Sequence, residues 1–487
     1  MKHSDPISDA IRNETRRQFF VRSARGLGVA ALATLMESEL HGAENVAAGG
    51  LPGLPHFPPT AKRAVFLHML GGPPHIDLFD YKPGLKDWAN RDLPESVRAG
   101  QRLTSMTANL SRFPVVPSKF AFAQHGNSGT WMSEALPFTA RMTDDIAVLR
   151  SVYQEAINHE PAITYMQTGF MVGGKPCLGS WLSYGLGTMN QDLPAFVVMN
   201  ATHSDPRANV QAVSARMWSA GFLSAQYAGV ALQNGANPVL YIQNPDGVPA
   251  NIRRQTLDAI NALNKIQYDR IADAQTMARI AQYEMAFRMQ TSVPELADFS
   301  SEPDRIWDMY GDDARKNGTF ARSCLMARRL LERGVRFVQI YHRGWDLHSN
   351  IPGVLPNQCR DVDQGGWALV QDLKQRDMLK DTVVVWTGEF GRTVFSQGAV
   401  ESYGRDHHAK VFSLWMAGGG IKPGIVYGSS DDFAFNVAAN PIHVRDLQAT
   451  ILHLFGIDHE RLTYKYLGLE QKLTGVHKAY VVKDILA

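Results

Sequence analysis

Cysteine is scarce in this chain of 487 residues, which contains only three (Cys177, Cys324 and Cys359). So few thiols cannot form a disulfide scaffold, and their odd number leaves at least one of them free or paired to another molecule. None has the Cys-x-x-Cys spacing of a metal site. A zinc–thiolate centre is therefore not expected.

The chain also lacks a surplus of charge of either sign. Its 49 Lys and Arg residues and 47 Asp and Glu residues leave a formal net charge of +2. This balance points neither to nucleic acid nor to an anionic membrane surface as a partner. Hydrophobic residues make up 45% of the chain and charged residues 20%, which is ordinary for a globular protein with a large core. The length allows two or three domains, or one large α/β domain.

No apolar run reaches the length of a transmembrane helix. Near the N-terminus, Arg16 and Arg17 precede two phenylalanines and a weakly apolar run, rich in Ala and Gly, at 26–36. This order resembles a twin-arginine export signal, although an amphipathic helix of a cytoplasmic protein is the alternative. We assign residues 1–45 to the signal, which predicts a periplasmic or other extracytoplasmic location.

The remainder divides into a short linker and one large domain. Residues 46–62 are rich in Gly and Pro and are expected to be an extended linker, followed by a folded domain at 63–487. Apolar runs typical of buried strands occur at 63–70, 146–152, 195–200, 238–243, 335–341, 382–386 and 412–417. Helical patterns lie between them at 252–290, 321–333, 361–378 and 444–455. This alternation predicts the α/β class, with a central, mostly parallel sheet and helices on both faces.

Acid and imidazole side chains follow two of these predicted strands at the same spacing. The first strand ends in Gly-Gly-Pro-Pro, which lacks the Gly-x-Gly-x-x-Gly spacing of a dinucleotide site, and His75 and Asp77 come next. The strand at 335–341 is followed by Asp346 and His348. Residues two apart lie on one side of an extended chain, as a pair of metal ligands would. As isolated residues, His75 and Asp77 could equally cap a turn.

The stretch 382–408 carries the densest group of such residues. The strand at 382–386 is followed by Glu389 and Arg392, and then by Asp406, His407 and His408. Ligands of open α/β sheets bind beyond the carboxyl ends of the strands, which is where these side chains are expected. The alternative is a surface loop with a Glu389–Arg392 ion pair and solvated histidines.

His159 is the remaining candidate. It follows the strand at 146–152, and Pro161 suits the first turn of a helix. A helix N-terminus attracts anions, so His159 could face an anionic substrate. It could equally be a capping or buried histidine.

Several of these motifs resemble those of the alkaline phosphatase/sulfatase superfamily, and in particular its bacterial family DUF1501. Thr-Gly-Glu-Phe-Gly at 387–391 resembles the sulfatase motif Thr-Ser-Asp-His-Gly, with Glu389 at the acid and Phe390 at the histidine. His-Glu-Pro at 159–161, with Thr-Gly at 168–169, resembles the nucleophile motif, with His159 at the nucleophile and Ile163 at the arginine. The segment 444–456 resembles a late structural helix of the superfamily. The resemblance implies a three-layer, alkaline-phosphatase-like sandwich.

The resemblance also implies a function. It predicts an exported, metal-dependent hydrolase of a small-molecule or glycan ester that carries phosphate or sulfate. His159 would be the nucleophile or general base and Arg392 the anion clamp. Zinc, manganese, iron or calcium would be bound by residues from the set His75, Asp77, Asp346, His348, Glu389, Asp406, His407 and His408. The alternative is a non-catalytic metal- or glycan-binding component of an exported complex, which Phe390 and Ile163 favour.

Overall fold

The computed structural model describes residues 49–233, 238–239, 244, 247–271 and 274–487. The predicted export signal at 1–45 therefore lies outside the described residues. So do residues 240–243 of the predicted strand at 238–243, and the two residues described there form a bend. The described residues belong to one structural unit, Ala48–Ala487.

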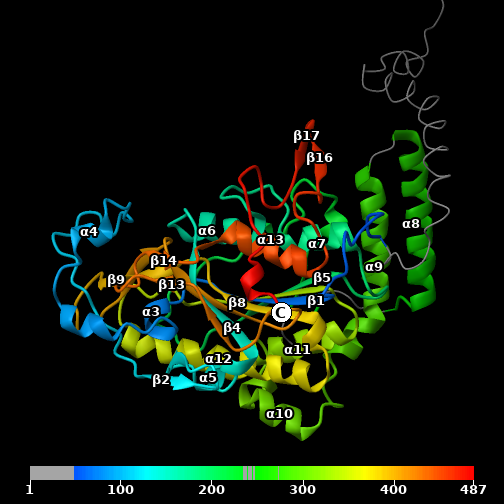
Figure 1. The fold of residues 1–487 in the computed structure, drawn as a ribbon. Coiled ribbons are helices and arrows are strands. Elements are labelled where there is room, and N and C mark those ends of the chain that lie inside the picture. The colour runs from blue at the N-terminus through cyan, green and yellow to red at the C-terminus, as the bar shows by residue number, and fades with distance from the viewer. Residues whose placement is uncertain (1–48, 234–237, 240–243, 245–246, 272–273) are drawn as a thin grey trace, which may run out of the picture. The chain divides into compact units, whose positions relative to one another are not determined.

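A mixed, mostly parallel sheet forms the centre of this unit (Figure 1). Its strand order is β12-β4-β11-β8-β1-β7-β5-β6, and β15 pairs with β4 beside this path. Among the described strands of this sheet, only β11 runs antiparallel to its neighbours. The strands are β1 (Arg63–Met69), β4 (Ile146–Tyr153), β5 (Phe196–Ala201), β6 (Val230–Leu232), β7 (Phe337–His342), β8 (Thr382–Thr387), β11 (Phe412–Ala417), β12 (Ile425–Tyr427) and β15 (Ile442–His443).

Helices cover both faces of the sheet, which confirms the predicted three-layer α/β architecture (Figure 1). Alternate side chains of a strand point to opposite faces, so Val65 and Leu67 of β1 pack on one side and Ala64 and Phe66 on the other. The first face is covered by α5 (Pro137–Ala140), α10 (Asp304–Tyr310), α11 (Phe320–Glu332) and α12 (Ile351–Gln375). The second is covered by α6 (His159–Thr168), α7 (Leu178–Leu186) and α13 (Val444–Leu454).

Smaller elements surround this sandwich. The long polar stretch predicted at 252–290 forms two adjacent helices, α8 (Ala250–Ile271) and α9 (Ala274–Ala297), which are tied together by the Arg254–Glu284 ion pair at 2.6 Å. Two further short helices are α3 (His75–Leu78) and α4 (Glu95–Arg98). Two-stranded pairs are β2 (Phe122–His125) with β3 (Thr130–Ser133), β9 (Gly391–Ser396) with β10 (Arg405–His408), β13 (Ser429–Ser430) with β14 (Val437–Ala439), and β16 (Tyr464–Tyr466) with β17 (Leu469–Gln471).

The described part of the predicted linker, residues 49–62, contains no helix or strand. It is bonded to the domain along its length. The Leu51 amide donates to Gly185 O at 2.9 Å, and the amides of Thr60 and Ala61 both donate to Leu454 O, at 2.9 and 2.8 Å. Leu51 and Leu54 also pack against the core that covers the second face of the sheet.

The topology brings four loops to one edge of the sheet. Strands β1, β4, β7 and β8 all point the same way, so their carboxyl ends meet at that edge. The segments that follow them are 71–80, 158–161, 344–348 and 388–392, the four expected from the sequence. Arg392 donates to the carbonyl of Gly71, and Glu389 contacts His159, so the segments are in direct contact. This edge therefore carries the candidate site.

Candidate functional site

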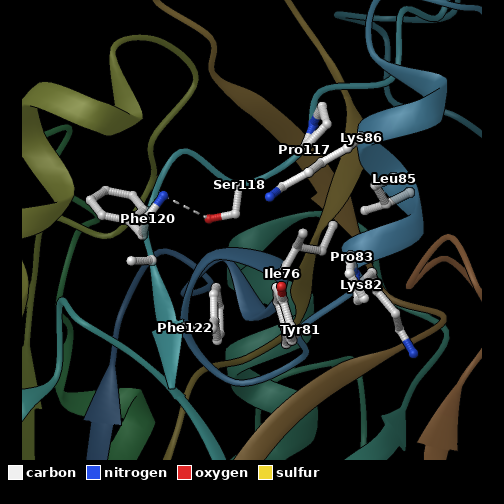
Figure 2. Close-up of a pocket in the computed structure, with 11 residues that line it drawn as sticks. Ile76, Tyr81, Lys82, Pro83, Leu85, Lys86, Pro117, Ser118, Phe120 and Phe122 are labelled. Atoms are coloured by element: carbon white, nitrogen blue, oxygen red, sulfur yellow. Dashed lines mark hydrogen bonds between the residues drawn. The ribbon is translucent and has the colours of Figure 1, made fainter. Parts of the chain in front are cut away.

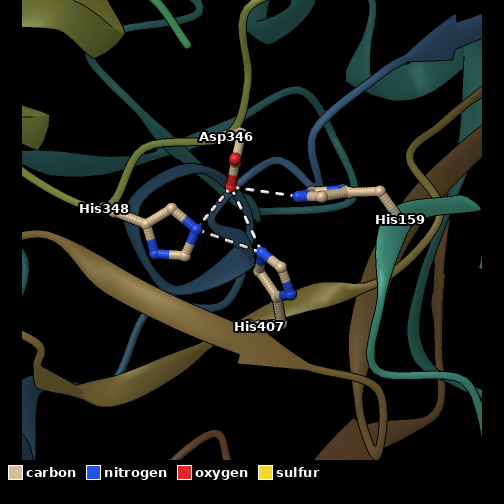
Figure 3. A group of neighbouring side chains, drawn as sticks. All are labelled: His159, Asp346, His348 and His407. Atoms are coloured by element: carbon tan, nitrogen blue, oxygen red, sulfur yellow. Dashed lines mark hydrogen bonds and ion pairs between the residues drawn. The ribbon is translucent and has the colours of Figure 1, made fainter. Parts of the chain in front are cut away.

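Four side chains from separate segments converge at this edge (Figure 3). Asp346 and His348 lie in the loop after β7, His159 begins α6, and His407 lies in β10. One potential ligand atom from each residue lies within 4.8 Å of the others. We call these four residues the His/Asp cluster.

One oxygen, Oδ1 of Asp346, is the centre of the cluster. The Nε2 atoms of His348, His159 and His407 lie 2.7, 3.1 and 3.2 Å from it. The Nε2 atoms of His348 and His407 are 3.1 Å apart. Figure 3 shows the three rings directed at this oxygen from three sides. Three imidazole nitrogens therefore surround one carboxylate oxygen.

The opposite nitrogen of each ring, Nδ1, faces a hydrogen-bond acceptor. His159 Nδ1 lies 2.6 Å from Oε1 of Glu389, and His407 Nδ1 lies 2.8 Å from the carbonyl oxygen of Ile157. His348 Nδ1 contacts Oε1 of Gln397. A neutral ring that donates its Nδ1 hydrogen to this acceptor carries its lone pair on Nε2. In that tautomer the three lone pairs point into the cluster.

This arrangement suits a cation. Two unprotonated Nε2 atoms 3.1 Å apart repel each other unless a proton or a metal ion lies between them. His159 Nε2 is buried and, despite its 3.1 Å distance from Asp346, is not aligned for a hydrogen bond with any described atom. Metal-bound histidines characteristically donate their other ring N–H to a carboxylate or carbonyl, and here each Nδ1 has such an acceptor beside it. The residues therefore fit a divalent metal ion.

The charges of the cluster residues follow from burial and from their mutual contacts. Burial lowers the pKa of His407 to about 4, so this ring is neutral near pH 7. Burial also lowers the pKa of His159, but its contacts with Asp346 and Glu389 outweigh burial and raise the pKa above its ordinary value. Burial raises the pKa of Asp346, yet the three imidazoles and Arg392 reverse this and hold it far below its usual range. The carboxylate is therefore ionised and available as a ligand.

Glu389 lies behind His159 and is completely buried. Its carboxylate accepts the Gly71 amide at 2.9 and 3.2 Å and lies 3.4 Å from His68 Nε2. Burial raises the pKa of Glu389, but the bonds to His159 and His68 outweigh it and lower the pKa to about 2. Glu389 is thus an anion that orients His159.

Arg392 is also fully buried and holds Asp346 instead of Glu389. Its Nη2 donates to Asp346 Oδ1 at 2.6 Å, its Nε to Gly72 O at 2.9 Å, and its Nη1 to Arg405 O at 2.9 Å. All three guanidinium nitrogens are therefore bonded to protein oxygens. The sequence analysis considered an ion pair between Glu389 and Arg392. In the structure Arg392 pairs with Asp346 instead.

Phe390 packs against two rings of the cluster. Its centroid lies 4.9 Å from that of His159 and 4.7 Å from that of His407. The side chain is buried, with 1% of its surface exposed. The residue that cannot coordinate a metal therefore serves as a wall that fixes two imidazoles.

The other residues proposed as ligands from the sequence do not reach the cluster, because each is bound elsewhere. Asp77 pairs with Arg405 at 2.7 Å and accepts the hydroxyl of Tyr403 at 2.7 Å. The remaining contacts are His75 Nε2 with Ala434 O at 2.9 Å, His408 Nε2 with Phe435 O at 2.5 Å, and Asp406 with the hydroxyls of Thr104 and Thr107. Burial lowers the pKa of His75, and that of His408 to about 4.

Three residues that contact the cluster carry no sequence signal. Asn209 and Gln211, in the long loop between β5 and β6, donate to Oδ2 of Asp346 at 2.6 and 2.9 Å. Gln397, which contacts Nδ1 of His348, also belongs to no recognisable sequence pattern. Amides in irregular loops show no periodicity, so only the fold reveals that they orient the cluster.

No helix within the described ranges is both long and apolar enough to cross a membrane. No curated protein matches the chain. Among solved structures, a sulfatase from Pseudoalteromonas sp. is 12% identical, with 82% of this chain and 68% of that chain covered and a TM-score of 0.31. A phosphonate monoester hydrolase from Silicibacter pomeroyi is 13% identical, with 66% of this chain and 68% of that chain covered and a TM-score of 0.30. An alkaline phosphatase from the Antarctic bacterium TAB5 is 10% identical, with 81% of this chain and 98% of that chain covered and a TM-score of 0.28.

These structural likenesses are too weak to transfer an activity. The family match is of another kind, because it covers most of the chain. Residues 61–486 match the family described as "Protein of unknown function (DUF1501)". The chain therefore belongs to the DUF1501 family.

Proposed function

We propose that the protein is a metal-dependent hydrolase of a phosphate or sulfate ester, or a related anionic ester, and that the His/Asp cluster holds one divalent ion. The observation that carries the proposal is the convergence of three Nε2 atoms on one carboxylate oxygen, with an acceptor behind every ring. Such a set is typical of a metal site in which outer hydrogen bonds fix the ligands.

The ligand types narrow the choice of metal. Three imidazoles and one carboxylate suit zinc, manganese or iron, whereas calcium prefers six to eight oxygen ligands. Calcium is therefore disfavoured. When bound, a divalent ion would supply Lewis-acid chemistry that polarises an ester oxygen and lowers the pKa of water.

The roles proposed for two residues differ from those proposed from the sequence. His159, expected there as nucleophile or general base, turns its Nε2 into the cluster and is assigned here as a ligand. Arg392, expected there as an anion clamp, is assigned here as a positioning residue, because its guanidinium is already bonded to Asp346 and to backbone carbonyls. The His348 side chain is 20% exposed and that of His159 11%, so a substrate would reach the cluster from their side.

The test is turnover of aryl phosphate, phosphonate and sulfate esters by protein loaded with zinc, manganese or iron. His348→Ala should abolish turnover and release metal, because it removes a ligand on the exposed side. His408→Ala is the matched control: this imidazole is also buried in the site region but binds Phe435 O. It should retain metal and most turnover. Turnover that survives in His348→Ala would remove the cluster from the mechanism.

The alternative is a non-catalytic metal- or glycan-binding component of a larger complex. It is favoured by Phe390 and Ile163, which stand where the resembling motifs have a histidine and an arginine. In that case the protein would bind metal in near-stoichiometric amount, lose it in His348→Ala, and hydrolyse none of the esters.

We further propose export by the twin-arginine route, from residues 1–45. Replacing Arg16 and Arg17 by Lys should retain the protein in the cytoplasm, because the export receptor reads the paired arginines. Cell fractionation measures this. Unchanged export of the double variant would assign the segment another role.

A further inference from the structure

A cavity of about 210 Å³ lies beside the 3-10 helix η1 (Pro83–Trp88) and strand β2 (Figure 2). It shares no lining residue with the His/Asp cluster. Its walls are mostly apolar: Ile76 and Leu85 on one side and Phe120 and Phe122 on the other. Tyr81 stacks on Phe122, with ring centroids 4.9 Å apart and planes 19° from parallel. The cavity is therefore bordered by flat aromatic groups.

One positive charge faces this cavity. Figure 2 shows the ammonium of Lys86 directed toward the hydroxyl of Ser118 across the cavity. Lys86 has no ion pair within the described part of the chain. The Ser118 oxygen accepts the Phe120 amide at 3.3 Å, which leaves its hydroxyl hydrogen free to donate. Two donors therefore line the same, mostly apolar cavity.

A second lysine lines the same cavity but is used elsewhere. The Lys82 ammonium lies 3.3 Å from Asp80 Oδ1 and donates to Ser430 O at 3.3 Å. In Figure 2 it points away from Lys86 and Ser118. The two lysines thus provide a natural comparison: one ammonium is free at the cavity and the other is satisfied by the protein.

A buried arginine joins the two segments next to the cavity walls. Arg405 is fully buried and pairs with Asp77 at 2.7 Å, next to the Ile76 wall. It also donates to Val116 O at 2.9 Å, next to the wall formed by Pro117 and Ser118. One guanidinium thus ties these two segments together, and a cavity whose walls are already positioned lowers the cost of binding.

The geometry points to a binding site, separate from the cluster, for a small anion carried on a single flat ring. A cavity of about 150 Å³ accepts benzene, so about 210 Å³ holds one six-membered ring with a compact anionic group. The ring packs on the aromatic wall, and the anion accepts hydrogen bonds from Lys86 and Ser118. Phenyl sulfate has both parts and is the probe of choice.

The experiment is a ligand-observed NMR titration of the full-length protein with phenyl sulfate, phenol and inorganic sulfate. We expect saturable binding of phenyl sulfate, and binding at least about tenfold weaker for phenol, which lacks the anion, and for sulfate, which lacks the ring. Lys86→Met keeps the apolar stem and removes the charge, so it should weaken phenyl sulfate about tenfold or more. Lys86→Arg should bind within about threefold of wild type, and Lys82→Met within about twofold.

The same titrations in the His348→Ala background separate this site from the cluster. Binding that depends on Lys86 should persist there, whether or not the cluster holds a metal. Equal binding by wild type and Lys86→Met would overturn the assignment of the site. If Lys82→Met and Lys86→Met weaken phenyl sulfate binding equally, the binding reflects the positive charge of this surface in general and the proposed site is wrong. If phenol binds as tightly as phenyl sulfate, the anionic group does not contribute to binding and the proposal is wrong.

Discussion

Asp346→Asn is the substitution that tests the His/Asp cluster most directly. The change keeps the shape of the side chain but removes the charge at the point where three Nε2 atoms meet. It also removes the partner of Arg392, which is fully buried. The variant should therefore lose both metal and stability, for two separable reasons.

The loss of stability follows from the Arg392–Asp346 pair, at 2.6 Å with side chains 0% and 5% exposed. Removing one member of a buried ion pair leaves the other uncompensated and costs about 3–5 kcal/mol. In a domain of this size, about 1 kcal/mol lowers Tm by about 1 °C, so we expect a fall of about 3–5 °C. The loss of metal adds to this: an ion present at about 1,000 times its Kd stabilises the wild type by about 4 kcal/mol.

Asp77→Asn is the matched control. Asp77 pairs with Arg405 at 2.7 Å, with both side chains 0% exposed, and lies outside the cluster. The two variants should lose similar stability when metal-free. Only Asp346→Asn should lose the metal, as measured by elemental analysis. It should also be the variant whose Tm no longer rises when zinc is added.

Two results would refute the reasoning. Wild-type protein that is folded, free of metal and indifferent to added zinc, manganese or iron would show that the cluster is not a metal site. Asp346→Asn with wild-type metal content, or Asp77→Asn without metal, would show that the ion lies elsewhere.

Three further predictions follow from single contacts. Glu389→Gln should weaken zinc binding about 10- to 100-fold, measured by competitive titration, because an anion no longer orients His159; unchanged affinity would deny Glu389 that role. Gly71→Ala should lower the free energy of unfolding by at least about 2 kcal/mol, since φ is +121° and a Cβ would lie 2.3 Å from the Asp346 amide; Gly84→Ala, with open space around it, should change little. Burial raises the pKa of Asp363 to about 6. Because ionisation of an acid with a raised folded pKa costs stability, the free energy of unfolding of the wild type should fall by up to about 3 kcal/mol relative to that of Asp363→Asn between about pH 4 and pH 7, measured by urea unfolding. A difference that does not change with pH would contradict this.

The architecture was predictable because it follows from local patterns. Runs of β-branched residues alternating with helical periodicity predicted the parallel sheet and its helical layers, and the strands at 63–70, 146–152, 335–341 and 382–386 were confirmed. Since parallel strands share an edge, the loops that follow them were correctly expected to meet. The sequence thus located the edge at which the site is built.

The membership of the cluster was decided by partners distant in sequence. His75–Asp77 and Asp346–His348 have the same spacing, yet Arg405 and Tyr403 bind Asp77, and Ala434 O binds His75. Residues two apart share one side only where the chain is extended, and His75–Leu78 is helical, so the shared spacing did not place even these two pairs alike. Which long-range donors meet them depends on how remote loops pack, and no local pattern encodes that.

The choice between His407 and His408 shows the same division. The sequence offered two adjacent imidazoles without deciding between them. In the structure they lie in β10, where successive side chains point to opposite faces: His407 opposite Arg392 of β9 and His408 opposite Gly391. His407 therefore faces the cluster and His408 faces Phe435 O. The sequence supplied the chemistry, and the register of the β9–β10 pair, set by packing against the rest of the domain, selected which ring could take part.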